Sequence, residues 1–337
     1  MYYVAMKDHE IGRNLATEQY LMNNVDFDEP LVLFYYEEPC IIVGRNQNTL
    51  EEINADYVRD HHIQVTRRLS GGGAVYQDLG NLCFSFVVDS DSQEFGDFKT
   101  FTKPIIDALH DMGATTATVS GRNDLLVDGK KFSGNAMYSR NGKTFSHGTL
   151  MLNVDLDVVP QALTVPTDKI ASKGIKSVRS RVTNLRPYLA PEYQEITVPE
   201  FQDALLKELF HVDSLDQIAD KEYHVTPEQQ KAIDKIYEDY YANWDWVYGK
   251  SPEFSVKRRK HFDMGTIDAR LSVHDGRIQN IKFYGDFFGS GDVHDVEEAL
   301  TGVRYDHEVI AEKLATLDLN QYFTGIPRTD IIDLIAQ

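Results

Sequence analysis

The chain has 337 residues, of which 42% are hydrophobic, and a formal net charge of −19 at neutral pH. This length suits two domains, and 17 Phe and 18 Tyr can build large cores. So acidic a chain is a poor partner for nucleic acid, and no segment approaches the ~18 consecutive apolar residues of a membrane span. The first residues lack the pattern of a signal peptide. Since the two cysteines, Cys40 and Cys83, lie among apolar neighbours, we expect a soluble cytoplasmic protein with reduced thiols.

Hydrophobic periodicity, capping residues and turn dipeptides predict an alternation of helices and strands over the first two thirds of the chain. In chain order we expect a helix at 14–24 capped by Asn14, strands at 31–36 and 40–44, a helix at 53–62, strands at 65–68 and 82–88, a helix at 98–112, a hairpin at 124–134 around Asp128-Gly129, a strand at 148–154, and helices at 199–210 and 227–241.

A second domain is expected after Gly249-Lys250-Ser251-Pro252, where the periodic pattern stops. Residues 266–273 and 277–284 alternate at period two and predict a hairpin, and Asp292 is placed to cap a helix that runs to Leu300. The sequence therefore predicts an α+β fold with a domain at 1–246 and a small α+β domain at 253–337.

One segment is typical of a ligand-binding loop: Arg67-Arg68-Leu69-Ser70-Gly71-Gly72-Gly73-Ala74-Val75-Tyr76. Glycine lets backbone N–H groups approach a ligand closely, and a cluster of such groups forms an anion-binding concavity. An adjacent arginine can clamp a phosphate or a carboxylate. Three glycines alone would also fit a flexible turn, but the paired arginines favour a phosphate-binding loop of an enzyme.

Other polar residues lie at predicted strand ends, where they could complete such a site. Asp124 begins the predicted hairpin, Lys131 follows its turn, and His147 precedes the strand at 148–154. A lysine and an arginine beside an N–H cradle suit the formation of an acyl-adenylate, because that reaction depends on neutralising and aligning two anions. Taken alone, Lys131 could equally be a solvated surface lysine and His147 a structural histidine.

A basic segment interrupts the acidic chain between residues 169 and 186, which contain no Asp or Glu. A solvated charged face would also explain it, but its glycine and serines favour a loop aimed at an anion. Its cations are Lys169, Lys173, Lys176, Arg179, Arg181 and Arg186.

These motifs together resemble the lipoate–protein ligases of the biotin/lipoate protein ligase superfamily. The matching segments run in family order: 67–81, with Arg-Arg-x-Ser-Gly-Gly-Gly-Ala-Val-Tyr-x-Asp-x-Gly-Asn, then Gly121-Arg122-Asn123-Asp124-Leu125, Lys131-Phe132-Ser133-Gly134-Asn135-Ala136, His147-Gly148-Thr149-Leu150, and 173–182. The resemblance covers residues 1 to about 245, and the C-terminal domain resembles the family's accessory domain. It implies a mixed-sheet catalytic domain of the biotin/lipoate protein ligase type.

The resemblance also implies a reaction in two steps. Lipoate and MgATP would give lipoyl-AMP and pyrophosphate, and the lipoyl group would then pass to a lysine of an acceptor protein. The acceptor would be a lipoyl domain of a 2-oxoacid dehydrogenase or the glycine-cleavage H protein.

Residue roles are carried over by position. Lys131 would be catalytic and contact both acyl group and phosphate; Arg68 and Gly73 would contact adenylate and lipoate; His147 would line the acyl pocket. Asn81 and Asp124 would hold the phosphate region. Mg²⁺ would arrive with ATP, with Asp124 as its candidate ligand and no fixed metal site. Further adenylate contacts would be Ser70, Ala74, Val75 and Tyr76, and the lid would carry Lys173, Lys176, Arg179 and Arg181.

Two other functions remain open at this point. The first is an ATP-independent transferase that moves lipoyl or octanoyl groups between carrier proteins through a cysteine; Cys40 and Cys83 lie outside the matched motifs, which favours the ligase. The second is a non-catalytic lipoate sensor, which would need neither Lys131 nor Arg68. Sensitivity to cysteine alkylation and release of pyrophosphate distinguish these functions.

Overall fold

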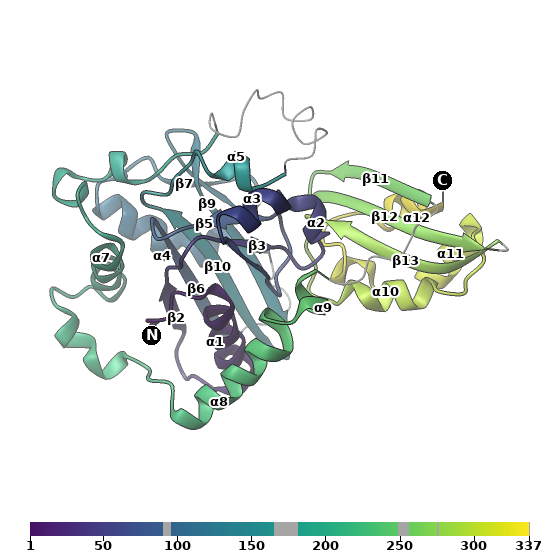
Figure 1. Ribbon diagram of the computed structural model, residues 1–337. Coiled ribbons are helices and arrows are strands. Elements are labelled where there is room, and N and C mark those ends of the chain that lie inside the picture. Colours follow the sequence, from purple (N-terminus) through teal and green to yellow (C-terminus); the bar gives the residue numbers. More distant parts are fainter. Residues whose placement is uncertain (90–95, 165–180, 249–255, 275, 337) are drawn as a thin grey trace. The chain divides into compact units, whose positions relative to one another are not determined.

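A computed structural model describes residues 1–89, 96–164, 181–248, 256–274 and 276–336 (Figure 1). The chain divides into two compact units. The first contains Met1–Ile42, Leu50–Thr66 and Val75–Asn243, and the second contains Val43–Thr49, Arg67–Ala74 and Trp244–Gln337. Two short loops of the N-terminal part, one of them the glycine loop, thus group with the C-terminal part. The limits 1–246 and 253–337 of the functional domains stay predictions.

The first unit is built on a mixed seven-stranded sheet with the order β1-β2-β6-β10-β9-β8-β7. β1 and β2 run parallel, and the other neighbours run antiparallel. This mixed sheet confirms the predicted fold class. The strands are β1 (Tyr2–Ala5), β2 (Leu31–Tyr35), β6 (Asn81–Asp89), β7 (Thr118–Ser120), β8 (Asp124–Val127), β9 (Lys130–Arg140) and β10 (Lys143–Met151).

A smaller sheet has the order β4-β3-β5. Its strands are β3 (Cys40–Val43), β4 (Gln64–Arg67) and β5 (Val75–Gln77). The helices of the first unit are α1 (Ile11–Asn24), α3 (Ala55–Asp60), α4 (Phe98–Asp111), α5 (Val159–Ala162), α7 (Val198–Phe210), α8 (Pro227–Ile236) and the π-helix η5 (Tyr237–Tyr241), while α2 (Thr49–Glu52) begins at the last residue of the loop Val43–Thr49. Short 3₁₀ turns lie at Arg186–Tyr188, Pro191–Tyr193 and Leu215–Lys221.

The two faces of the large sheet have different coverings. One face forms the main core with α4 and α7, through residues such as Phe84, Leu150 and Phe201. The opposite face packs against α1, whose Glu18 contacts His147 of β10. Both faces bury apolar side chains, and burial of apolar area dominates folding. The face toward α1 also carries polar residues, among them Ser85 and His147.

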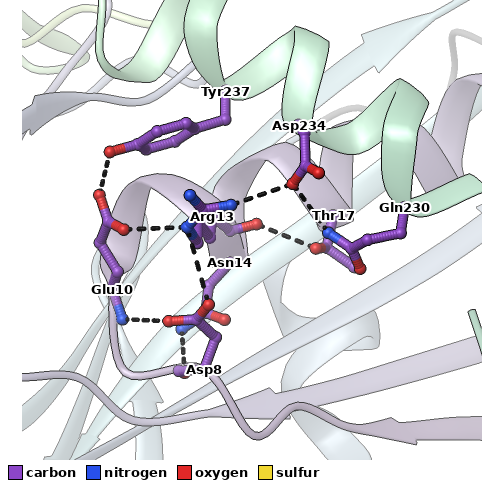
Figure 2. Close-up of polar contacts among 8 residues, drawn as sticks. All are labelled: Asp8, Glu10, Arg13, Asn14, Thr17, Gln230, Asp234 and Tyr237. Atoms are coloured by element: carbon purple, nitrogen blue, oxygen red, sulfur yellow. Dashed lines mark hydrogen bonds and ion pairs between the residues drawn. The ribbon is translucent and has the colours of Figure 1, made fainter. Parts of the chain in front are cut away.

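Helix α1 starts three residues earlier than predicted, at Ile11, and Asn14 is not its cap. Figure 2 shows the reason: Arg13 lies between Glu10 and Asp234, with Nε 3.0 Å from Glu10 and Nη1 3.0 Å from Asp234, and Tyr237 donates to Glu10. The side chain of Asn14 donates to the carbonyl of Asp8 instead. This polar network holds the first turn of α1 against α8 and η5, so tertiary contacts override the capping preference of Asn14.

The second unit packs helices on one face of a three-stranded antiparallel sheet of order β11-β12-β13. The predicted hairpin is confirmed as β12 (Gly265–His274) and β13 (Arg277–Gly285), and the predicted helix as α10 (Val293–Leu300), capped by Asp292. The sequence reading missed β11 (Val256–Phe262), α11 (His307–Leu314) and α12 (Arg328–Ala336); α9 (Trp244–Val247) and a 3₁₀ turn at Leu319–Gln321 complete the unit. No helix in the described residues is long and apolar enough to cross a membrane.

Candidate functional site

Lys131 and Asp124 are brought together by the hairpin of β8 and β9. Asp128 and Gly129 both have left-handed backbones, with φ of 48° and 74°, which is the geometry of a tight hairpin turn. The Nζ of Lys131 lies 2.7 Å from the carboxylate of Asp124, and a Cβ added at Gly134 would lie 3.0 Å from that Nζ. Both charged side chains stay about one third exposed. Since such exposed pairs add little stability, the ion pair orients the lysine but contributes little to folding, and the lysine stays accessible to a ligand.

The backbone of Lys131 is tied to the chain that follows the basic segment. Its N–H donates to the carbonyl of Arg181 at 2.7 Å, and its carbonyl accepts from Thr183 at 2.8 Å. Of the four predicted lid residues, Arg181 is therefore beside Lys131, while Lys173, Lys176 and Arg179 lie outside the described residues. The prediction placed the end of the basic segment too far along the chain, because Arg186 belongs to a 3₁₀ turn and donates to the carbonyl of Ile196.

His147 is fixed on β10 by a carboxylate that sequence reasoning missed. Its Nδ1 lies 3.1 and 3.2 Å from the two carboxylate oxygens of Glu18, and both residues are buried. Glu18 lies on α1, 129 residues before its partner, and no local pattern marks it. The pair sets the ring orientation of His147, as a carboxylate does for a histidine held in one tautomer.

Asn81 lies at the start of β6 and is buried. Its Nδ2 donates to Gln77 at 3.3 Å and contacts the sulfur of Cys83 at 3.4 Å. Its Oδ1 is buried and accepts no hydrogen bond from the residues that the structure describes. An unsatisfied buried acceptor is costly, so this oxygen is available for a ligand or a bound cation.

The sheet register sets the spacing of these residues. Asn81 is opposite Met151, and Ser85 is opposite His147. His147 and Met151 are four residues apart on one strand, or roughly 13 Å at about 3.3 Å per residue. This spacing is of the order of the length of a medium-chain acyl group. Asn81 and His147 therefore lie on the same face of the sheet, at positions well separated along the strands.

The two arginines of the glycine loop belong to the second unit and have different environments. The guanidinium of Arg67 donates to the carbonyls of Gly44, Arg45, Gln47, Trp246 and Val247 and to the hydroxyl of Thr49, at 2.7 to 2.9 Å. It is buried, and the indole of Trp246 donates back to its carbonyl. The hypothesis that an arginine here clamps an anion is therefore wrong for Arg67, which joins three backbone segments.

Arg68 shapes the glycine loop itself. Its Nη2 donates to the carbonyls of Gly71 and Gly73, each at 2.8 Å. The carbonyl of Ser70, a buried residue, accepts from the N–H of Arg45. The hydrogen bonds from Arg68 to the carbonyls of Gly71 and Gly73 fix the orientation of these peptide groups. A loop with fixed peptide groups suits a cradle of backbone N–H groups.

The last predicted adenylate contacts follow this loop. Ala74 ends it, and Val75 and Tyr76 belong to β5 in the first unit, where they pair with Ile42 and Ile41 of β3. Tyr76 is half-buried, and burial raises the pKa of its phenol well above the usual range, so this hydroxyl is neutral.

The glycines of the loop offer a test that separates binding from stability. A Cβ at Gly73 would meet nothing within 4 Å, whereas Gly72 has φ of 94° and a Cβ there would lie 3.0 Å from Arg68. We expect Gly73→Val to weaken ATP binding at unchanged melting temperature, because the new side chain meets only the ligand. Gly72→Val should also lower the melting temperature. Wild-type affinity of Gly73→Val for ATP would mean that the phosphate cradle lies elsewhere.

Glu37 is a fully buried carboxyl group near the two cysteines. Burial raises the pKa of its carboxyl from 4.5 to about 8, and the interaction with the thiol of Cys83 offsets only part of this shift. Burial likewise raises the pKa of the thiols of Cys40 and Cys83. Both thiols are therefore protonated near neutral pH, which is the state of poor nucleophiles.

The raised pKa of Glu37 predicts a dependence of stability on pH. The folded state binds this proton more tightly than the unfolded state, so the stabilisation is complete below pH 4.5 and is lost as pH rises towards 8. We expect Glu37→Gln to increase the free energy of unfolding at pH 8, by at most about 5 kcal/mol at ~1.4 kcal/mol per pKa unit. Urea unfolding at both pH values measures this. An equal effect of the substitution at pH 4.5 and pH 8 would contradict the assignment.

Among the described residues, no three His, Cys, Asp or Glu side chains form a group that could hold a metal ion by themselves. The oxygens that suit a hard cation are the carboxylate of Asp124 and the unpartnered Oδ1 of Asn81, which Mg²⁺ would accept as part of a set completed by substrate phosphates.

Comparisons with known proteins agree with this architecture. The model of the lipoyl protein ligase A/B catalytic domain matches residues 10–210, and that of the bacterial lipoate protein ligase C-terminus matches residues 251–335. The chain is 47% identical over 322 residues to lipoate-protein ligase LplJ of Bacillus subtilis and 45% identical over 323 residues to lipoate–protein ligase 1 of Staphylococcus aureus. Each alignment covers 96% of both chains.

Solved structures have the same fold. P. falciparum LipL1 in complex with lipoate aligns with a TM-score of 0.79 at 24% identity, covering 98% of this chain and 97% of that one. The bi-partite lipoate protein ligase of Thermoplasma acidophilum aligns with a TM-score of 0.63 at 27% identity, covering 76% of this chain and 98% of that one. The resemblance of the sequence motifs is thereby confirmed, and the chain belongs to the family of lipoate–protein ligases, with both their catalytic domain and their bacterial C-terminal domain.

Proposed function

We propose that this protein activates lipoate with ATP to lipoyl-AMP and then transfers the lipoyl group to a lysine of an acceptor protein. The observation that carries the proposal is the accessible Lys131, held by Asp124 at a hairpin end and bonded through its backbone to Arg181. The names of the close relatives support the same activity.

In the first step a carboxylate oxygen of lipoate attacks the α-phosphorus of ATP. The bond between that phosphorus and the oxygen bridging to the β-phosphate breaks, and pyrophosphate leaves with the electron pair. Two anions must approach each other, so the ammonium of Lys131 contributes by neutralising charge on the carboxylate and the phosphate as they meet. Backbone N–H groups of the loop from Gly71 to Gly73 would donate hydrogen bonds to the phosphate oxygens.

Magnesium would arrive with ATP and supply further neutralisation of the phosphates. The chain's own oxygens for it are those of Asp124 and Asn81. In this role Asp124 has two tasks, because its carboxylate also orients the ammonium of Lys131.

In the second step the amine of an acceptor lysine attacks the acyl carbon of lipoyl-AMP. The carbon–oxygen bond breaks, AMP leaves, and a proton is released from the new amide nitrogen. His147, held by Glu18, would line the acyl pocket and fix the far end of the chain while the carbonyl reacts. The acceptor would be a lipoyl domain or a glycine-cleavage H protein.

The alternative of a cysteine-dependent transferase has little support from the thiols. Cys40 and Cys83 are buried, and burial raises the pKa of each thiol. A nucleophilic cysteine requires the opposite environment, exposed and electropositive.

The proposal is tested by measuring pyrophosphate release with ATP and lipoate, before and after adding an apo lipoyl domain. We expect a stoichiometric burst without acceptor and turnover with it, and neither should respond to alkylation of accessible thiols. Transfer without ATP that alkylation abolishes would identify the transferase instead. Lipoate binding without any pyrophosphate release would identify a sensor.

The predicted lid is tested by limited proteolysis. Cations between Lys169 and Arg181 repel one another until an anion is bound, and closure would shield a labile mixed anhydride from water. We expect lipoate plus ATP to protect this segment from trypsin. Equal cleavage with and without the intermediate, when the intermediate is demonstrably bound, would mean that the segment is not a lid.

A further inference from the structure

Strand β11 is the edge strand of the sheet in the second unit (Figure 1), and its sequence is strongly basic. Its sequence, Val-Lys-Arg-Arg-Lys-His-Phe, places four cations in a row at Lys257, Arg258, Arg259 and Lys260. The three strands together contain seven Lys or Arg and a single Asp. In a chain with a net charge of −19 this is an unusual local surplus of positive charge.

The register places four of these cations on one face of the sheet, while Arg258 and Lys260 are opposite the core residues Ala269 and Ile267. Lys257 is opposite Arg270, and Arg259 is opposite Asp268. On the other side of the central strand, Arg270 is opposite Lys282. The intervening residues of β12, such as Ile267 and Leu271, point to the helices and form the core. The face away from the helices is therefore polar and mainly cationic.

The carboxylate of Asp268 serves two of these cations. Arg270 donates to it from both Nε and Nη2, at 3.1 and 2.7 Å, and stacks on the ring of Tyr284 at 4.8 Å. Arg259 lies 3.7 Å from the same oxygen. Lys257 forms no ion pair within the described residues and is exposed. Among the described residues, Arg259 and Arg270 thus share the carboxylate of Asp268, and Lys257 lies on the same face. Lys257 and Arg259 are exposed at the surface.

The helical segment that follows the sheet has the opposite charge. Between Asp286 and Ala336 there are 11 acidic residues and three basic ones. An anionic protein surface would be repelled by this helical segment and attracted at β11. Charge of this kind mainly steers encounter and fixes orientation.

A simpler explanation is that the charges protect an edge strand from aggregation. One lysine on the edge would serve that purpose. Four consecutive cations, two of them on the polar face beside a shared carboxylate, are more than protection of the edge requires.

We propose that the polar face of β11, formed by Lys257, Arg259 and His261, docks an acidic surface of the acceptor protein during transfer. This inference rests on the proposed function, because it assumes that an acceptor receives the acyl group. The face contributes to the second step only and leaves formation of the adenylate unchanged.

The test compares two double substitutions with the same change in charge. Lys257→Glu with Arg259→Glu reverses the face, and Arg304→Glu with Lys313→Glu reverses two exposed cations elsewhere in the unit. The full-length enzymes are given ATP, lipoate and an apo lipoyl domain of net negative charge. We expect the first variant to lose roughly 10- to 100-fold in kcat/KM for the acceptor, which is the range of electrostatic steering. Pyrophosphate release without acceptor should stay at the wild-type rate, and the control variant should resemble the wild type in both assays.

The outcomes separate the two hypotheses. Absence of pyrophosphate release in the wild type would contradict the ligase assignment itself. Normal release with an unchanged kcat/KM in the β11 variant would overturn the docking face alone, and aggregation of that variant with normal kcat/KM would show that the charges only protect the edge. If the variant does not fold, the salt dependence of the wild-type enzyme provides the test. Its kcat/KM for the acceptor should fall roughly tenfold as salt is raised from about 50 to about 300 mM, because salt screens the charges. A kcat/KM that does not change with salt would overturn the proposal.

Discussion

Replacing Lys131 with Ala is expected to slow formation of lipoyl-AMP by about 10²–10³, the usual effect of removing one preorganised donor. The melting temperature should hardly change, because the pair with Asp124 is about one third exposed and such pairs add little stability. Single-turnover measurement of lipoyl-AMP with ATP and lipoate gives the rate.

Lys130→Ala is the matched control, since Lys130 is an exposed lysine next to it on the same strand. That variant should keep the wild-type rate. Equal losses in both variants would assign the effect to general surface charge, and a normal rate in a folded Lys131→Ala enzyme would remove Lys131 from the mechanism.

Replacing Arg67 is expected to have the largest effect on stability. Arg67→Lys keeps the charge but loses the planar fork, so several of its acceptors, among them the carbonyls of Gly44 and Val247, become buried without a donor. Each unsatisfied group costs about 1–3 kcal/mol, so the loss should reach about 3 kcal/mol or more. The only two Trp residues, Trp244 and Trp246, lie in the same unit, so their fluorescence during urea unfolding reports on it.

Arg277→Lys provides the comparison, because its guanidinium donates to one carbonyl, that of Gly302, at an exposed position. It should cost less than about 0.5 kcal/mol, as surface substitutions usually do. A stable Arg67→Lys protein with a cooperative unfolding transition at the wild-type urea concentration would show that the three segments do not depend on this guanidinium.

The parts of the fold that could be predicted are those determined by local sequence. The turn at Asp128-Gly129 needs two left-handed residues, and these two residue types adopt that conformation readily. The alternation in β12 and β13 is readable because one face is apolar. Strand β11 was missed for the converse reason, since its run of four cations hides the period of two.

The site was predicted in part by motif and in part missed. The resemblance predicted Lys131 and Asp124 as site residues, and the structure brings them together. Neither spacing nor composition reveals that Glu18 lies behind His147 or that Arg67 donates to carbonyls of distant segments. Both facts depend on contacts between distant segments. Asn14 failed as a cap for the same reason, because the network around Arg13 starts the helix earlier.

The reaction through a mixed anhydride is tested most directly by tracing an oxygen atom. Lipoate labelled with heavy oxygen in its carboxylate is incubated with the enzyme, ATP and an apo lipoyl domain, and AMP is analysed by mass spectrometry. Because the attacking carboxylate oxygen stays on phosphorus when the acyl carbon is transferred, the account predicts that the AMP carries one labelled oxygen. Lipoylated acceptor accompanied by unlabelled AMP, or formed without consumption of ATP, would contradict it.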